Sequence, residues 1–136
     1  MLKMKTLLIT ILLLLPLSFA NAVVDFSTLK ISLSDNMQRD CTVSNTDILG
    51  CYFPATDQIF IDQNLSLITL RVVLLHEVGH FLMKDVVLEE YQRVFSNWDC
   101  QTLPCLQETA ATYFTLWMDK IPMQESYQQF FTSLFK

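Results

Sequence analysis

The stretch His76-Glu77-Val78-Gly79-His80 places two imidazoles and one carboxylate within five consecutive residues. Residues four apart on a helix lie on the same face, about 40° from each other. His76 and His80 can therefore hold one metal ion together. Glu77, about 100° from His76, can reach a water beside the metal without binding the ion itself. The pattern predicts a zinc site with Glu77 as general base.

The helix that carries this motif is predicted from Leu67 to Met83, with Ser66 as its N-cap. Apolar residues cover nearly all of its sides, which indicates a central helix buried on most faces. Gly79 costs about 1 kcal/mol relative to Ala in a helix, so we expect it to serve close packing or access to the metal. The alternative is a pair of core histidines, but burying two unpaired imidazoles is costly.

Catalytic zinc usually takes three protein ligands and a water, so a third ligand must come from elsewhere. The next positions on the histidine face, which offer no zinc ligand, are Met83, Lys84 and Val87. The acids in later segments are Asp99, Glu108, Asp119 and Glu125. Glu108 is preferred, because it lies opposite the apolar face of the next predicted helix, beside small residues that allow close approach. Asp99 is the second choice, and a solvent-facing Glu108 is the alternative.

The rest of the sequence predicts an α+β fold, with a small sheet packed on three or four helices. Gln58–Asp62 is short, β-branched and aromatic, which is typical of a strand. Val23–Leu33 is either a strand or a short helix, and Ser34–Thr56 is predicted mostly as loop. Further helices are predicted from Val86 to Phe95, from Pro104 to about Asp119, and after Pro122. Their expected core residues are Leu106, Ala110, Tyr113, Phe114 and Trp117, then Tyr127, Phe130, Phe131, Leu134 and Phe135.

The first 22 residues have the layout of a secretory signal peptide, with early lysines, an apolar run and the pattern Ala20-Asn21-Ala22. The run is too short for an ordinary membrane span. We therefore expect cleavage after Ala22, no stable membrane span afterwards, and one secreted or periplasmic domain over residues 23–136; an uncleaved anchor is the alternative. Removal of Lys3 and Lys5 leaves seven basic and fourteen acidic residues, a net charge of −7, which argues against nucleic-acid binding.

Cysteine usage supports export, because an even number of cysteines in an exported chain suggests disulfides. The four are Cys41, Cys51, Cys100 and Cys105. Each local pair brackets a short turn-like segment, so we favour 41–51 and 100–105 among the three possible pairings. Free thiols or another pairing are the alternatives, and a four-cysteine zinc site is disfavoured because tight C-x-x-C pairs are absent.

Two segments resemble a known group, the compact gluzincin peptidases, and especially the ImmA/IrrE-type metallopeptidase domains. They are Leu75–Leu82 (LHEVGHFL) and Gln107–Phe114 (QETAATYF). The resemblance covers roughly residues 57–118. It implies zinc ligation by His76, His80 and Glu108, with Glu77 as the base.

The resemblance also implies an activity, peptide-bond hydrolysis on a peptide or protein substrate. The strand at 58–62 stands where the group has its substrate-side strand, so we expect a peptide along its exposed edge, at Ile59, Phe60 and Ile61. Relatives often stabilise the oxyanion with a separate histidine; here the candidates are Tyr113, Tyr91 and Arg93. The alternatives are a non-catalytic zinc-binding or interaction protein with the same fold, and a disulfide-stabilised envelope protein without metal.

Overall fold

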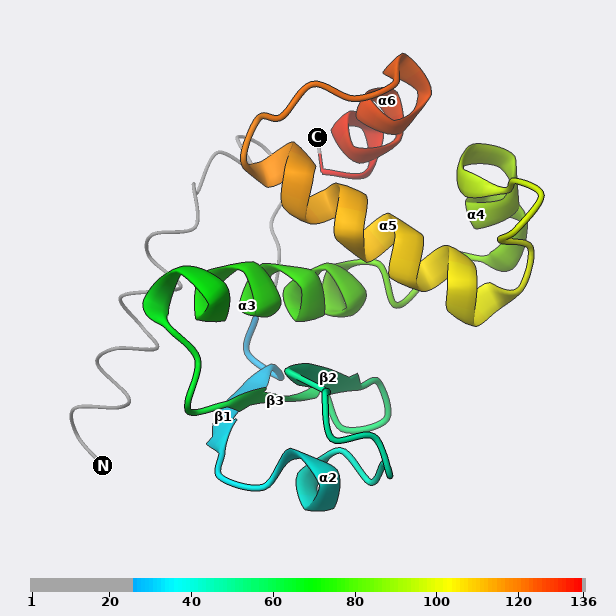
Figure 1. Cartoon of the computed structure of the whole chain (residues 1–136). Coiled ribbons are helices and arrows are strands. Elements are labelled where there is room, and N and C mark those ends of the chain that lie inside the picture. The colour runs from blue at the N-terminus through cyan, green and yellow to red at the C-terminus, as the bar shows by residue number, and fades with distance from the viewer. Residues whose placement is uncertain (1–25, 136) are drawn as a thin grey trace.

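The computed structural model describes residues 26–135, so the expected signal peptide at 1–22 lies outside the described residues. The fold is α+β, as predicted, with a three-stranded sheet covered by helices (Figure 1). Its elements are β1 (Lys30–Ser34), α2 (Met37–Asp40), β2 (Gly50–Phe53), β3 (Gln58–Asp62), α3 (Leu67–Leu82), α4 (Leu88–Phe95), α5 (Leu103–Met118) and α6 (Glu125–Leu134). Within residues 26–135, no helix is long and apolar enough to cross a membrane.

The sheet has the order β1-β3-β2, which makes β3 the central strand. β1 runs parallel to β3, and β2 pairs antiparallel with it through a short hairpin. The strand predicted at Gln58–Asp62 is therefore confirmed, but the expectation that its edge is exposed is wrong. Both of its edges are hydrogen-bonded, and Ile59 and Ile61 are fully buried. In the sheet formed by the described residues, the unpaired edge next to α3 belongs to β2.

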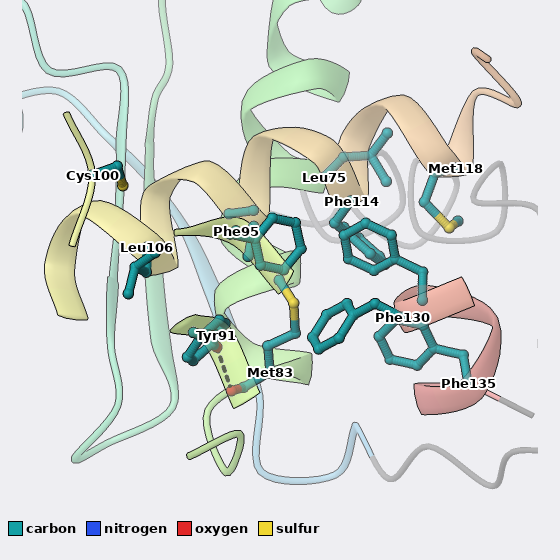
Figure 2. Close-up of a cluster of buried hydrophobic side chains, with 13 residues drawn as sticks. Leu75, Met83, Tyr91, Phe95, Cys100, Leu106, Phe114, Met118, Phe130 and Phe135 are labelled. Atoms are coloured by element: carbon teal, nitrogen blue, oxygen red, sulfur yellow. Dashed lines mark hydrogen bonds between the residues drawn. The ribbon is translucent and has the colours of Figure 1, made fainter. Parts of the chain in front are cut away.

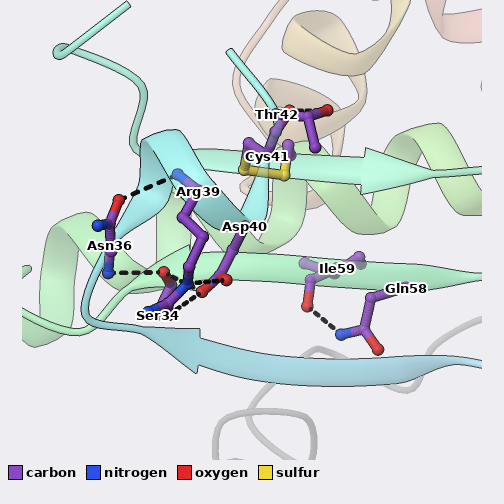
Figure 3. The surroundings of a disulfide bond; sticks show 9 residues. Ser34, Asn36, Arg39, Asp40, Cys41, Thr42, Gln58 and Ile59 are labelled. Carbon is purple, nitrogen blue, oxygen red and sulfur yellow. Dashed lines mark hydrogen bonds and ion pairs between the residues drawn. A yellow bond between two sulfur atoms is a disulfide. The ribbon is translucent and has the colours of Figure 1, made fainter. Parts of the chain in front are cut away.

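The segment Ser34–Thr56, predicted mostly as loop, contains α2 and β2. Both elements are four residues long, too short for a hydrophobic period to reveal them. Local contacts hold them instead: the Asn36 side chain accepts the backbone N–H of Arg39 at the start of α2, and the disulfide Cys41–Cys51 ties the end of α2 to β2 (Figure 3).

Helix α3 lies between the sheet and the other long helices (Figure 1). It begins after the predicted N-cap, since the Ser66 hydroxyl accepts the backbone N–H of Thr69. One face packs Leu70, Leu74 and Val78 against β3. Another face places Leu75 in the core formed by the helices. The prediction of a central helix buried on most faces is confirmed.

The helical core joins α3 to α4, α5 and α6 through a cluster of aromatic rings (Figure 2). Phe95 of α4 contacts Phe130 and Phe131 of α6, with ring centroids 5.1 and 6.0 Å apart. The expected core residues are largely buried, but Leu134 is 37% exposed at the end of α6. Helix α4 begins at Leu88 instead of Val86, because Val87 is extended and serves as N-cap.

Gly79 serves helix packing in this fold. A Cβ at this position would lie 2.9 Å from Cδ1 of Phe114 and 3.5 Å from the backbone of Ala111, both on α5. Phe114 is fully buried and its ring has no room to move aside. Of the two roles expected for Gly79, the close approach of α5 to the histidine helix is the one that the contacts support.

We predict that Gly79→Ala lowers the free energy of unfolding by about 1 kcal/mol. Overpacking costs about 1–3 kcal/mol, and the gain in helix propensity returns about 1 kcal/mol. Urea unfolding followed by circular dichroism measures the difference. Ile68→Ala, on an exposed part of the same helix, is the control and should change stability by less than about 0.5 kcal/mol. A more stable Gly79→Ala protein would contradict the packing role.

Candidate functional site

The structure brings the predicted ligand residues together at one point between α3 and α5. The Nε2 atoms of His76 and His80 lie 3.2 Å apart. Glu108 reaches across from α5, with one carboxylate oxygen 3.0 Å from Nε2 of His76 and the other 2.9 Å from Nε2 of His80. Among the residues described, these three form a group of ligand atoms that could hold a metal ion, all within 4.8 Å of one another.

This donor set fits zinc. Two nitrogen ligands at about 2.0–2.1 Å from a tetrahedral ion lie about 3.3 Å apart, close to the separation of the two imidazole nitrogens. The histidine side chains are mostly buried, whereas the side chain of Glu108 is 65% exposed. The cluster is therefore open toward solvent, which leaves access for a water and a substrate, as a catalytic zinc site requires.

The ligand cluster is electrostatically coupled. The hydrogen bonds from His76 and His80 hold the pKa of the Glu108 carboxyl far below its ordinary value. Burial of His76 disfavours its charged form, but the hydrogen bond to Glu108 and the nearby charges of Glu77 and Glu108 outweigh burial and raise the His76 pKa. The third ligand is thus a carboxylate under ordinary conditions, which is the form that binds a metal.

Glu77 lies beside this cluster and is only 6% exposed. Burial raises the pKa of its carboxyl, and the two histidines only partly oppose that rise. A carboxylate with a raised pKa is a stronger base, so the position suits proton transfer near neutral pH. Gly50 of β2 makes room for it, because a Cβ there would lie 3.0 Å from Oε1 of Glu77 and 2.6 Å from Cγ1 of Val73.

A cleft of about 500 Å³ runs over this site. Its walls come from β2 and the segment before it, from α3 and from α5, and its lining includes Gly50, Tyr52, Glu77, His80, Lys84 and Glu108. A hollow of about 520 Å³ near the end of α5 and the start of α6 has no histidine, cysteine or carboxylate in its lining. The cleft is therefore the place where the molecule can carry out metal chemistry.

Ile59, Phe60 and Ile61, expected to bind substrate, do not line this cleft. Ile59 and Ile61 point into the core against α3, and the Phe60 ring contacts Phe53. The residues of the sheet that do line the cleft are Gly50, Cys51 and Tyr52 of β2. The strand that borders the cleft is thus β2, one strand further out than the strand predicted to do so.

Of the three oxyanion candidates, Tyr113 lies on the wrong side of α5. Five residues separate it from Glu108, which turns it about 140° around the helix. Its ring packs on Tyr127 and Phe95, with centroids 4.5 and 6.3 Å away. Tyr91 does line the cleft, but its hydroxyl donates to the carbonyl of Met83, and burial raises its pKa to about 12. Arg93 pairs with Glu90.

The other acids considered as third ligand lie outside the cluster. Asp119 pairs with Arg71 at 2.6 Å. Glu125 accepts a hydrogen bond from Gln129 on α6. Asp99 lies in the loop before α5, where its backbone N–H donates to Asn97. The structure therefore favours Glu108 over its alternatives on position alone.

Tyr52 and Lys84 line the cleft, and Asp57 contacts both, although the sequence patterns singled out none of the three for the site. Lys84 follows His80 by four residues, so the helical period placed it on the histidine face, but it was considered only as a metal ligand. Its ammonium pairs with Asp57 at 2.9 Å, and the Tyr52 hydroxyl donates to the same carboxylate at 2.8 Å. Hydrogen bonds from Thr28, Lys84 and Tyr52 lower the Asp57 pKa to about 2.

The two disulfides have the local pairing favoured by the sequence, and one of them borders the cleft. Cys51 lies in the cleft wall formed by β2. Cys100–Cys105 closes the loop that enters α5, three residues before Glu108. The N-cap of α5, Thr102, makes no side-chain cap hydrogen bond, so the disulfide replaces a cap in holding the first turn.

A comparison with protein families finds one matching model, a peptidase family described as the IrrE N-terminal-like domain, over residues 32–136. Of the elements in residues 26–135, this region contains the whole sheet except its first residues, every helix and the complete ligand cluster. Neither the curated proteins nor the solved structures yield a match.

We predict that the purified protein binds about one zinc ion per chain through His76, His80 and Glu108. His80→Ala should abolish tight binding, and Glu108→Ala should weaken it strongly, because each removes one of three protein ligands. Elemental analysis and competition with a chromogenic chelator measure content and affinity. Asp99→Ala is the matched control; loss of zinc there, with full retention in Glu108→Ala, would refute this ligand set.

We predict that opening Cys100–Cys105 weakens zinc binding more than opening Cys41–Cys51. Only the first bridge holds the uncapped start of the helix that carries Glu108. Paired Cys→Ser variants of each bridge, titrated with zinc under the same conditions, make the comparison. Equal zinc affinities in both variants would mean that the aromatic core alone positions α5.

Proposed function

The chain belongs to the family of IrrE N-terminal-like peptidase domains, and from this premise we propose that it is a zinc-dependent metallopeptidase acting on peptide or protein substrates outside the cytoplasm. The observation that carries the proposal is the convergence of His76, His80 and Glu108 on one point, with the buried carboxylate of Glu77 beside it at the floor of a cleft. Two histidines from α3 and a glutamate from α5 match the donor set of a catalytic zinc site.

Each residue has a distinct role in the proposed reaction. His76, His80 and Glu108 would hold the ion, which when bound lowers the pKa of a water and polarises the scissile carbonyl. Glu77 takes the proton from the attacking water and passes it to the leaving amine. Its burial favours this shuttle, since a raised carboxyl pKa lets it hold the proton between the two steps.

The substrate would bind as an added strand on β2. The outer edge of β2 is unpaired in the described part of the sheet, and this strand lines the cleft beside Glu77. An extended peptide gains backbone hydrogen bonds from such an edge, independent of its sequence. His80 and Glu108 line the same cleft as β2, so a peptide on this edge would lie beside the residues that would hold the metal.

Export is part of the proposal. It is supported by the signal-peptide pattern of residues 1–22 and by the two disulfides. Disulfides persist in oxidising compartments, where the first turn of α5 would be held in place.

One observation favours a second function, a zinc-binding protein without catalysis. No oxyanion donor is assigned, because Tyr113 packs in the aromatic core and the Tyr91 hydroxyl is occupied by Met83. Loss of an oxyanion donor alone typically costs about 10²–10³ in rate, so some turnover is still expected from the remaining groups.

We predict that Glu77→Gln reduces peptide cleavage by at least about 10²-fold, within the 10²–10⁴-fold range of a general base. Gln keeps the size of the side chain but loses the basic oxygen, so zinc content should not change. A broad peptide library analysed by mass spectrometry, with zinc-loaded and fully oxidised protein, provides the assay. Glu89→Gln, on the exposed side of α4, is the control. Cleavage by Glu77→Gln at the wild-type rate would exclude this mechanism, and a wild type that cleaves nothing would favour the non-catalytic function.

A further inference from the structure

At Tyr52 and Lys84 the cleft adjoins a compact polar cluster around Asp57. This carboxylate is only 9% exposed and lies in the β2–β3 turn, where its backbone has a positive φ of 49°. Thr28 donates to Oδ2 at 2.7 Å and Tyr52 donates to Oδ1 at 2.8 Å. Lys84 donates to both oxygens at 2.9 Å. A carboxylate has about four acceptor positions, so those of Asp57 are all in use.

Lys84 and Tyr52 are the members of the cluster that line the cleft, and Lys84 carries the charge. Its ammonium lies 4.8 Å from the ring centroid of Phe81 and its side chain is 31% exposed, so the group is held in place yet accessible. An ammonium has three N–H donors, and Asp57 uses two of them. Within residues 26–135 no acceptor takes the third. This end of the cleft therefore offers one donor to a ligand.

The spacing of Lys84 from Glu77 follows the repeat of β2. Gly50 lies against Glu77, and Tyr52, two residues further along β2, donates to the Asp57 carboxylate that also holds Lys84. In a β-strand, carbonyls of residues two apart point the same way, about 6.8 Å from each other. A peptide that turns one carbonyl toward the metal site thus turns the carbonyl two residues away toward Lys84.

The direction along the peptide follows from β2. Gly50 lies against Val73 and Glu77, whereas the Tyr52 ring contacts the Phe81 ring at 6.2 Å, so β2 and α3 run the same way. A peptide antiparallel to β2 runs in the opposite direction, and antiparallel pairing is the more stable one. Moving from His80 toward Lys84 therefore means moving toward the N-terminus of the substrate.

Charge decides which acceptor suits this position. The positive charge of Lys84 is balanced by Asp57, and Asp85 adds a negative charge close enough to act on Tyr52. With these three groups the local charge is −1, so a second carboxylate would be repelled. A neutral backbone carbonyl accepts the free N–H without that cost.

We propose that Lys84, held by Asp57, binds the substrate's backbone carbonyl two residues N-terminal to the scissile carbonyl. This inference rests on the proposed function, since it needs a peptide seated on β2. It assigns the cleft a sequence-independent anchor, because the group recognised is backbone.

The test uses a peptide that the wild type cleaves, bound without turnover to the zinc-loaded Glu77→Gln protein. Replacing one carbonyl at a time by a thiocarbonyl removes a good acceptor at a known position. At the position two residues N-terminal to the scissile carbonyl, the dissociation constant from calorimetry should rise about tenfold, the factor for one charge-assisted hydrogen bond at a partly exposed site. Adding Lys84→Met should itself weaken binding about tenfold and make that thiocarbonyl substitution neutral.

Two further variants serve as controls for this proposal. Lys84→Met/Asp57→Asn removes both charges of the pair, so that no charged partner is left buried alone, and it should behave like Lys84→Met. Arg71→Met breaks the comparable ion pair of α3 with Asp119, outside the cleft lining, and should leave peptide affinity unchanged. An unchanged affinity in both Lys84 variants, or a thiocarbonyl effect that persists in them, overturns the anchor while leaving the metallopeptidase proposal intact. If the wild type cleaves no peptide, both the anchor and the metallopeptidase proposal are refuted.

Discussion

Helix α3 is packed from two sides, and this constraint shapes the rest of the molecule. Leu70, Leu74 and Val78 bind it to the sheet, while Leu75 binds it to the helical core. The narrow strip left between these faces carries the polar residues His76, Glu77 and His80. A helix fixed on both sides cannot rotate without exposing apolar side chains, each worth about 1.5–3 kcal/mol when buried. The packing of the hydrophobic core therefore sets the positions of the polar side chains in the cleft.

The third ligand is positioned by a separate set of contacts. Helix α5 is anchored by Leu106, Ala110 and Phe114, all fully buried, and it approaches α3 closely because residue 79 has no side chain. At its uncapped start the disulfide Cys100–Cys105 holds the first turn. Packing and a covalent link thus place Glu108 next to the histidines. A metal ion bound there would therefore serve the chemistry of the cleft, because the hydrophobic core and the disulfide stabilise the fold.

The sequence predicted what depended on period and spacing. Helix α3, its cap at Ser66, strand β3 and the ligand trio all follow from patterns of two, three or four residues. It did not predict β2, because four residues carry no period, and so the strand bordering the cleft was expected to be β3. It also offered Tyr113 as one of three oxyanion candidates, whereas the Tyr113 ring packs on Phe95 and Tyr127. The angle between Glu108 and Tyr113 around the helix already argues against Tyr113. Choosing among the three candidates, however, requires knowing which residues each of them contacts in the folded protein.

The role of Lys84 could not be predicted from the sequence for a similar reason. The sequence could place it on the histidine face, yet its meaning depends on Asp57, a turn residue 27 positions earlier, and on the direction of a strand that was not predicted. A partly buried ion pair of this kind contributes little net stability, because the cost of taking its charges out of water offsets their attraction. Its effect is geometric: it holds the Lys84 ammonium in one place beside the cleft. A cleft that binds peptides by their backbone needs such fixed donors more than it needs apolar pockets, since the backbone offers the same acceptors whatever the sequence of the substrate.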